Sequence, residues 1–128
     1  MKEKYELEFI LNSSPRILEK MFSSPDGLGE WFADDVTVKN DIYTFNWDGS
    51  SEQARLINNN KLQSRIRFKW LADEEDGIDS YFEIGYTVDP ITNEVALNIS
   101  DFALSEDKES AVLLWNQQVA ELKRILGA

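Results

Sequence analysis

Acid–base chemistry in this chain would have to come from carboxylates, because the sequence contains neither histidine nor cysteine. Those absences remove imidazole bases, thiolate nucleophiles and the usual ligands of structural zinc. Asp101 is the carboxylate that stands out. It follows Val95, Leu97 and Ile99 at alternate positions, so strict alternation along a strand would turn it toward a core. A carboxyl group buried there would have a raised pKa and could serve as a general base.

The other interpretation of Asp101 is structural. If the strand ends or bulges just before it, Phe102 and Leu104 pack in its place, and we favour this interpretation. We therefore assign no catalytic residue, keep Asp101 as a weak candidate only, lean toward a protein that is not an enzyme, and predict no cofactor.

A run of carboxylates at residues 73–77, Asp-Glu-Glu-Asp-Gly, raises the question of a calcium site. Calcium loops alternate their oxygen ligands and close with a bidentate glutamate, whereas these carboxylates are adjacent. The run is more typical of a solvated hairpin loop, and we predict no metal site.

Large apolar side chains recur at alternate positions along the middle of the chain and at helical spacing near its end. If they face a cavity, they would bind an apolar ligand, since pockets are mostly apolar with a few orienting polar groups. If they pack against one another, they are simply core, as interiors normally are. The candidate lining residues are Phe45, Trp47, Ile66, Phe68, Trp70, Phe82, Ile84, Tyr86, Trp115 and Val119.

Polar groups that could orient a ligand are few. Ser64 interrupts the inward row of its predicted strand and is the best candidate, although we favour the interpretation that it is a small residue with its hydroxyl bonded to nearby backbone. Thr44, Asn46 and Gln118 would join it if the register turns them inward. Trp31, with Phe32 beside it, could either gate the mouth of a cavity or seal the end of the sheet.

Two helices and a strand precede this middle region. Residues 3–11 alternate as a half-buried strand does. Ser14 before Pro15 and Ser24 before Pro25 are start signals for two short helices, the first ending near Phe22 and the second limited to a turn or two by its glycines.

Six further strands follow as an antiparallel meander, because period-two alternation is interrupted by short polar turns. Their predicted spans are 35–40, 42–47, 51–58, 62–70, 80–89 and 94–103. The fifth strand of the chain places a basic row on its outer face, which Glu83 of the next strand could meet across the ladder. A long amphipathic helix is predicted over 105–126, ended by Gly127.

The overall composition fits one domain over residues 1–128. The net charge of −11 repels polyphosphates, so we exclude nucleic acid as a partner. No apolar run approaches the roughly 20 residues that span a bilayer. No signal peptide is evident, so we predict a cytoplasmic protein that does not insert into membranes. Nothing in the pattern decides the oligomeric state.

The order of these predicted elements resembles that of the START and birch-pollen-allergen-like (SRPBCC) helix-grip superfamily. Residues 24–32, Ser-Pro-Asp-Gly-Leu-Gly-Glu-Trp-Phe, resemble a segment ending in Trp-Phe in the branch related to the C-terminal domain of the heat-shock chaperone ATPase activator. Residues 45–49, Phe-Asn-Trp-Asp-Gly, are similar to the third strand and turn of that branch. Trp115, followed by Val119 and Leu122, resembles the buried face of its closing helix.

This resemblance implies an α+β helix-grip fold, in which a curved seven-stranded antiparallel sheet holds the C-terminal helix across its concave face, with a cavity between them. Relatives use that cavity for lipids, sterols, polyketides or other apolar ligands. We therefore predict a non-enzymatic domain that binds a small apolar or amphipathic molecule between sheet and helix. Two alternatives stay open: a protein-interaction module like the chaperone activators, which would meet a basic partner, and a small cyclase or hydrolase with Asp101 as its base.

Overall fold

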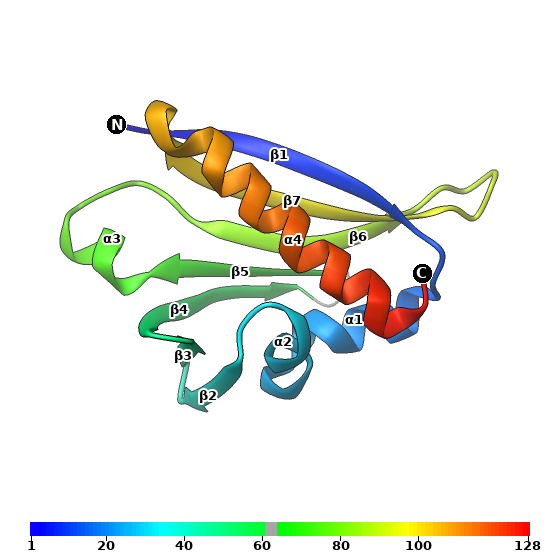
Figure 1. The fold of residues 1–128 in the computed structure, drawn as a ribbon, viewed down its shortest axis with the longest axis horizontal. Helices are drawn as coiled ribbons and strands as arrows, with labels where there is room; N and C mark the ends of the chain where they lie inside the picture. The colour runs from blue at the N-terminus through cyan, green and yellow to red at the C-terminus, as the bar shows by residue number, and fades with distance from the viewer. Residues whose placement is uncertain (61–63) are drawn as a thin grey trace.

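The computed structural model describes residues 1–60 and 64–128 and has the predicted α+β architecture (Figure 1). The seven antiparallel strands lie in the order β1-β7-β6-β5-β4-β3-β2. The strands are β1 (Lys2–Leu11), β2 (Asp35–Lys39), β3 (Ile42–Trp47), β4 (Ser50–Asn60), β5 (Arg65–Trp70), β6 (Phe82–Val88) and β7 (Val95–Leu104). The helices are α1 (Pro15–Ser23), α2 (Pro25–Trp31), α3 (Leu71–Glu75) and α4 (Lys108–Leu126), with a 3₁₀ turn, η1 (Ser105–Asp107), before α4.

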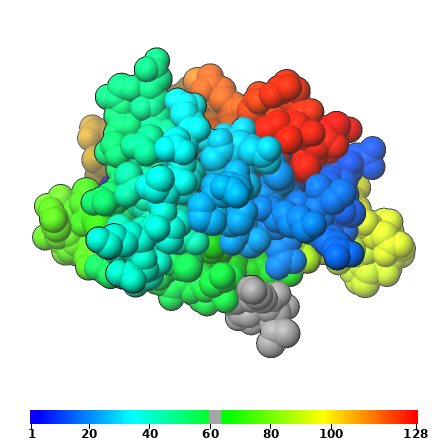
Figure 2. Space-filling view, turned by 90° about the horizontal axis from the view of Figure 1, so that it is seen from below, coloured from blue at the N-terminus to red at the C-terminus, as the bar shows by residue number. Residues whose placement is uncertain are grey.

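The two short helices start where their caps predict. The Ser14 hydroxyl accepts a hydrogen bond from the Ile17 amide at 3.2 Å, and the Ser24 hydroxyl accepts one from the Gly27 amide at 3.0 Å. Pro15 and Pro25 follow these caps at the first helical position, where a missing N–H costs nothing. Figure 2 shows α1 and α2 covering the lower end of the molecule, beside the last turns of α4.

The long helix α4 crosses the face of the sheet diagonally (Figure 1). Its buried residues are Trp115, Val119 and Leu122, as the helical spacing predicts. It ends at Gly127, which adopts the left-handed conformation with φ 68° and donates its amide to the carbonyl of Arg124. Glycine is favoured at this position because other residues have a Cβ that crowds the left-handed backbone. None of the helices in the described part of the chain is long and apolar enough to span a membrane.

The sheet register separates an apolar face, which packs in the core, from a face that carries charged residues. On β5, Ile66 and Phe68 are buried in the hydrophobic core, while Arg67 points to the other face and lies opposite Glu83 of β6. The predicted charge pair is therefore confirmed: a guanidinium nitrogen of Arg67 lies 3.0 Å from a carboxylate oxygen of Glu83. The Arg67 guanidinium also stacks 3.8 Å from the centroid of the Tyr81 ring.

Two local predictions were wrong. Residues 71–75 form the short helix α3, whereas the acidic run was predicted to be a solvated loop, and Asp73 is buried. Strand β5 begins at Arg65, so Ser64 lies in the preceding turn with φ 53° and not in the inward row of a strand. Its carbonyl accepts the Tyr86 amide at 3.2 Å. Leu62, which was predicted to begin that inward row, lies outside the described residues.

Candidate functional site

The concave face of the sheet carries a cluster of aromatic rings in mutual contact. Phe32 lies at its centre: its ring centroid is 5.1 Å from that of Phe45 and 5.5 Å from those of Phe82 and Trp115. Phe68 stacks on Phe82 with centroids 5.0 Å apart. Such contacts are those of a close-packed interior. Seven of the predicted lining residues belong to the hydrophobic core that includes these rings and are almost fully buried, namely Phe45, Ile66, Phe68, Phe82, Ile84, Trp115 and Val119.

At one end, the aromatic cluster opens into a cleft of about 120 Å³ between α4 and the sheet. This volume corresponds to about four water molecules at about 30 Å³ each, and drug-sized pockets start at about 300 Å³. The cleft therefore has room for a small head group and not for a lipid chain or sterol. Its lining residues are Phe32, Trp47, Glu52, Trp70, Asp101, Ala111, Leu114, Trp115 and Gln118.

Asp101 faces the core, as alternation along its strand requires. Strand β7 continues to Leu104 in register, with Asp101 opposite Tyr5 of β1, so our preferred interpretation that the strand ends or bulges before Asp101 was wrong. The apolar row of β7 stops at Ile99, but pairing with β1 keeps the strand extended and its side chains alternating as far as Leu104. Phe102 consequently turns to the other face, where its ring packs 4.9 Å from that of Tyr81.

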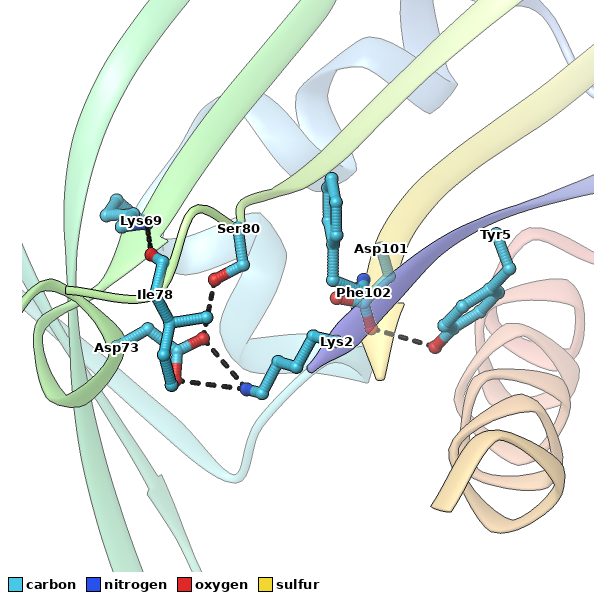
Figure 3. Close-up of polar contacts among 8 residues, drawn as sticks. All are labelled: Lys2, Tyr5, Lys69, Asp73, Ile78, Ser80, Asp101 and Phe102. Carbon is cyan, nitrogen blue, oxygen red and sulfur yellow. Dashed lines mark hydrogen bonds and ion pairs between the residues drawn. The ribbon is translucent and has the colours of Figure 1, made fainter. Parts of the chain in front are cut away.

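Three donors surround the Asp101 carboxylate. The Tyr5 hydroxyl donates to one carboxylate oxygen at 2.9 Å (Figure 3), and the indole N–H of Trp115 donates to the same oxygen at 2.8 Å. The backbone amide of Phe102 donates to the other oxygen at 2.8 Å. These bonds join β1, β7 and α4 at a single partly buried side chain.

Burial raises the pKa of Asp101 above its usual value of 3.8, although the hydrogen bonds from Trp115, the Phe102 amide and Tyr5 and the charge of Lys2 act in the opposite direction. The pKa of Tyr5 is also raised, first by burial and then by the Asp101 charge. Because the Asp101 pKa is higher in the folded state, folding takes up a proton at this site between the two pKa values. Its contribution to stability therefore declines as the pH rises through the raised pKa.

Two side chains hold the carbonyl of Phe32 at the edge of the cleft. The indole N–H of Trp47 donates to it at 2.9 Å, and the side-chain amide of Gln118 donates to it at 2.8 Å. These two hydrogen bonds link β3 and α4 to the carbonyl of Phe32, which caps the end of α2. Gln118 is turned inward, as one of our alternatives required.

The other predicted site residues lie away from the cleft. Trp31 is buried and donates its indole N–H to the Met21 carbonyl at 2.8 Å, and it is not among the residues that line the cleft. The Tyr86 ring packs 6.3 Å from that of Phe22 on α1. Thr44 and Asn46 alternate with the buried Phe45 and therefore face the other side of the sheet.

Three lining residues escaped the sequence analysis: Glu52, Ala111 and Leu114. Ala111 and Leu114 flank the apolar stripe of α4 and are not part of its regular spacing. Glu52 lies on β4 among exposed polar residues. No local pattern distinguishes them, because the packing of α4 on the sheet is what brings them together.

A second polar cluster joins α3 to the start of β1 (Figure 3). The Lys2 ammonium lies 2.8 Å and 3.0 Å from the two carboxylate oxygens of Asp73, and the Ser80 hydroxyl donates to Asp73 at 2.6 Å. The Lys69 ammonium donates to the Ile78 carbonyl nearby. Burial alone would raise the pKa of Asp73, but the Lys2 and Ser80 hydrogen bonds, with the charges of Lys2 and Lys69, outweigh it and hold the pKa below 3.8.

We expect Asp73→Asn to lower the free energy of unfolding at about pH 7 by about 1–3 kcal/mol, the range for a buried partner left poorly bonded. The folded-state pKa is depressed, so this stability is present above the unfolded pKa and lost as the pH falls through the folded one. Urea denaturation should therefore show a difference between wild type and variant that shrinks toward about pH 3.

The matched control for Asp73→Asn is Asp76→Asn, which alters an exposed carboxylate three positions along the same run. That substitution is expected to change stability by less than about 0.5 kcal/mol. Equal effects of the two substitutions at neutral pH would contradict a stabilising role for the Asp73 cluster.

Comparison with known proteins gives a family and several structural neighbours. A family model described as a START-like superfamily domain matches residues 1–128. A Bacteroides fragilis protein solved by NMR is 37% identical, with a TM-score of 0.65 over 97% of this chain and 90% of that one. The Aha1 dimer from Colwellia psychrerythraea gives a TM-score of 0.78 at 12% identity, over 97% of this chain and 96% of that one. No curated protein matches the chain.

The XoxI protein from Bacillus cereus is similar at the level of fold, with a TM-score of 0.74 at 12% identity, over 98% of this chain and 94% of that one. These matches agree with the element order that the sequence predicts. A match over the full length and a relative above 30% identity lead to one conclusion: the chain belongs to the START-like superfamily.

Proposed function

We propose that this protein binds a small amphipathic molecule in the cleft at the open end of its aromatic core. START-like folds bind ligands or proteins, so the fold is compatible with this role. The observation that carries the proposal is the lining itself: three tryptophans, Trp47, Trp70 and Trp115, line a space together with the partly buried carboxylate of Asp101. Apolar walls with a few convergent polar groups are the usual composition of a ligand site.

The site is smaller than the ligand cavity that we predicted across the whole concave face. Most residues of that face contact each other in the core, and the cleft is formed by those at its end. The proposed ligand is therefore a small molecule, or the small end of a longer one whose remainder lies in solvent. Tight binding of so few atoms would depend on polar contacts as well as apolar area.

The first experiment is native mass spectrometry of the purified protein, followed by denaturing extraction to identify any molecule that travels with it. Titration of candidate ligands against tryptophan fluorescence provides the second readout, because three of the four tryptophans line the cleft. We expect a stoichiometric adduct or a saturable fluorescence change that identifies a class of small ligand.

The matched variants place the same leucine at two positions of α4. Ala111→Leu fills the cleft and should weaken ligand binding by at least about tenfold through steric exclusion. Gln117→Leu alters an exposed position of the same helix and should leave binding unchanged. If no ligand is found, or both variants bind it equally, the cleft is not the binding site. The exposed Leu113 and Leu114 on α4 then become the first place to look for a protein partner.

A further inference from the structure

Three hydrogen-bond donors around the cleft are already engaged. The indole N–H of Trp47 is bonded to the Phe32 carbonyl, and that of Trp115 is bonded to Asp101. Gln118 uses its amide to donate to the Phe32 carbonyl. The carboxylates of Glu52 and Asp101 contribute oxygens only when ionised. An occupant that donates hydrogen bonds or carries positive charge would suit these carboxylate oxygens.

The carboxylate of Asp101 lacks a cationic partner. Among residues 1–60 and 64–128, no lysine or arginine forms an ion pair with it. Lys2 is the cation that acts on its pKa, but the ammonium of Lys2 is bonded to Asp73. A partly buried charge without an opposite charge is destabilising, and a bound cation would supply the missing partner.

The aromatic walls suit the same kind of occupant. The rings of Trp47 and Trp70 lie with centroids 6.5 Å apart at an interplanar angle of 51°, so they form a corner and are not stacked flat on each other. The Trp115 ring projects from α4, and its centroid lies 5.5 Å from that of Phe32. Tryptophan faces attract cations more strongly than other aromatic rings do, and aromatic cages of this kind bind methylated ammonium groups.

We propose that the cleft binds a small organic cation, such as an alkylated ammonium head group, between Trp47, Trp70 and Trp115 with Asp101 and Glu52 as the neutralising carboxylates. This inference rests on the proposed function and specifies its ligand. The volume of about 120 Å³ suits a head group of a few heavy atoms. The net charge of −11 would also concentrate cations around the molecule.

The test compares two probes of the same shape. Choline carries a trimethylammonium group, and 3,3-dimethylbutan-1-ol replaces its nitrogen with carbon and is neutral. Binding is followed by NMR titration of the four indole N–H signals, of which Trp31 is an internal reference because it lies outside the cleft. We expect the signals of Trp47, Trp70 and Trp115 to shift with choline, and the neutral probe to bind at least about tenfold more weakly.

Two variants separate charge from shape. Asp101→Asn removes the buried charge at nearly constant size and should weaken choline binding by about tenfold while leaving the neutral probe unaffected. Glu52→Gln alters an exposed rim residue, so it should fold normally and weaken choline binding by a smaller factor of about two to three. Thermal unfolding of each variant confirms that the fold is intact, and Glu52→Gln keeps the test decisive if Asp101→Asn does not fold.

Three outcomes decide the matter. Preference for choline that is lost in Asp101→Asn or reduced in Glu52→Gln supports the cation site. Equal affinity for the two probes overturns the cation site but leaves the proposed function intact, since the cleft would still hold a small amphipathic molecule. No shift with either probe, together with no adduct in native mass spectrometry, overturns both.

Discussion

Replacing Gly27 with alanine is expected to lower the free energy of unfolding by about 3 kcal/mol or more, at or beyond the upper end for overpacking. A Cβ at this position would lie 2.1 Å from the carbonyl oxygen of Lys20 and 2.8 Å from the Cα of Met21. Both are backbone atoms of α1, so no change of rotamer can relieve the clash. The two short helices would have to separate, and chemical denaturation would measure the loss.

Gly29 of the same helix is the matched control. A Cβ there would make ordinary contacts with Val36 at 3.8 Å and 3.9 Å. Because alanine favours helix over glycine by up to about 1 kcal/mol, Gly29→Ala should be neutral or stabilising. The same change from glycine to alanine is therefore expected to lower the free energy of unfolding at Gly27 and not to lower it at Gly29. A small effect of Gly27→Ala would show that α1 and α2 are less closely packed in solution than described here.

Truncation of Phe45 to alanine is expected to destabilise the protein by about 3–5 kcal/mol, the range for removing a fully buried phenylalanine. Its side chain has no exposed surface and contacts the rings of Tyr43, Phe68 and Phe82, with centroids 6.1, 5.7 and 6.3 Å away. Removing it leaves a hole at the centre of the cluster that supports the cleft. Urea denaturation of the variant would measure the change in midpoint.

The control for Phe45 is Leu113→Ala on α4, where the leucine is 58% exposed. That substitution should change stability by less than about 0.5 kcal/mol. If Phe45→Ala costs less than about 1 kcal/mol, the ring cluster does not have the interior packing described above.

Local sequence signals predicted the elements of this fold well. Ser14 and Ser24 with their following prolines mark both short helices, and Gly127 marks the end of α4. These signals are strong because each satisfies a backbone requirement within a few residues of itself. Alternation located the seven strands of the described residues, because it records which face each residue presents to the core.

The errors occurred where contacts distant in sequence decide the structure. Asp73 is buried because Lys2 and Ser80 satisfy its carboxylate, and Lys2 is 71 residues away along the chain. Asp101 stays in register because β1 pairs with β7, and its partner Tyr5 is 96 residues away. The sequence marks Asp101 because it is a carboxylate at a position where alternation predicts an apolar residue. The donors that bond to it, Tyr5 and Trp115, come from other elements and depend on the tertiary fold.

The candidate site was predictable in part, because alternation and helical spacing indicate which aromatic residues face the core. The tryptophans at positions 47, 70 and 115 were expected to line a ligand site, and all three line the cleft. The size of the cleft depends on how Phe32 fills the space among Phe45, Phe82 and Trp115, and side-chain packing of this kind leaves no periodic trace in a sequence.

The strand order determines when each strand can find its partner during synthesis of the chain. From β2 to β7, each strand pairs with the strand next to it in sequence, so those ladders close short loops. β1 is the exception, because it is the first strand synthesised and its one neighbour in the sheet is the last, β7. Closing that long loop carries a larger entropic cost than any hairpin in the meander. During synthesis, β1 therefore has no partner until residues 95–104 have emerged from the ribosome, and it must remain soluble until then.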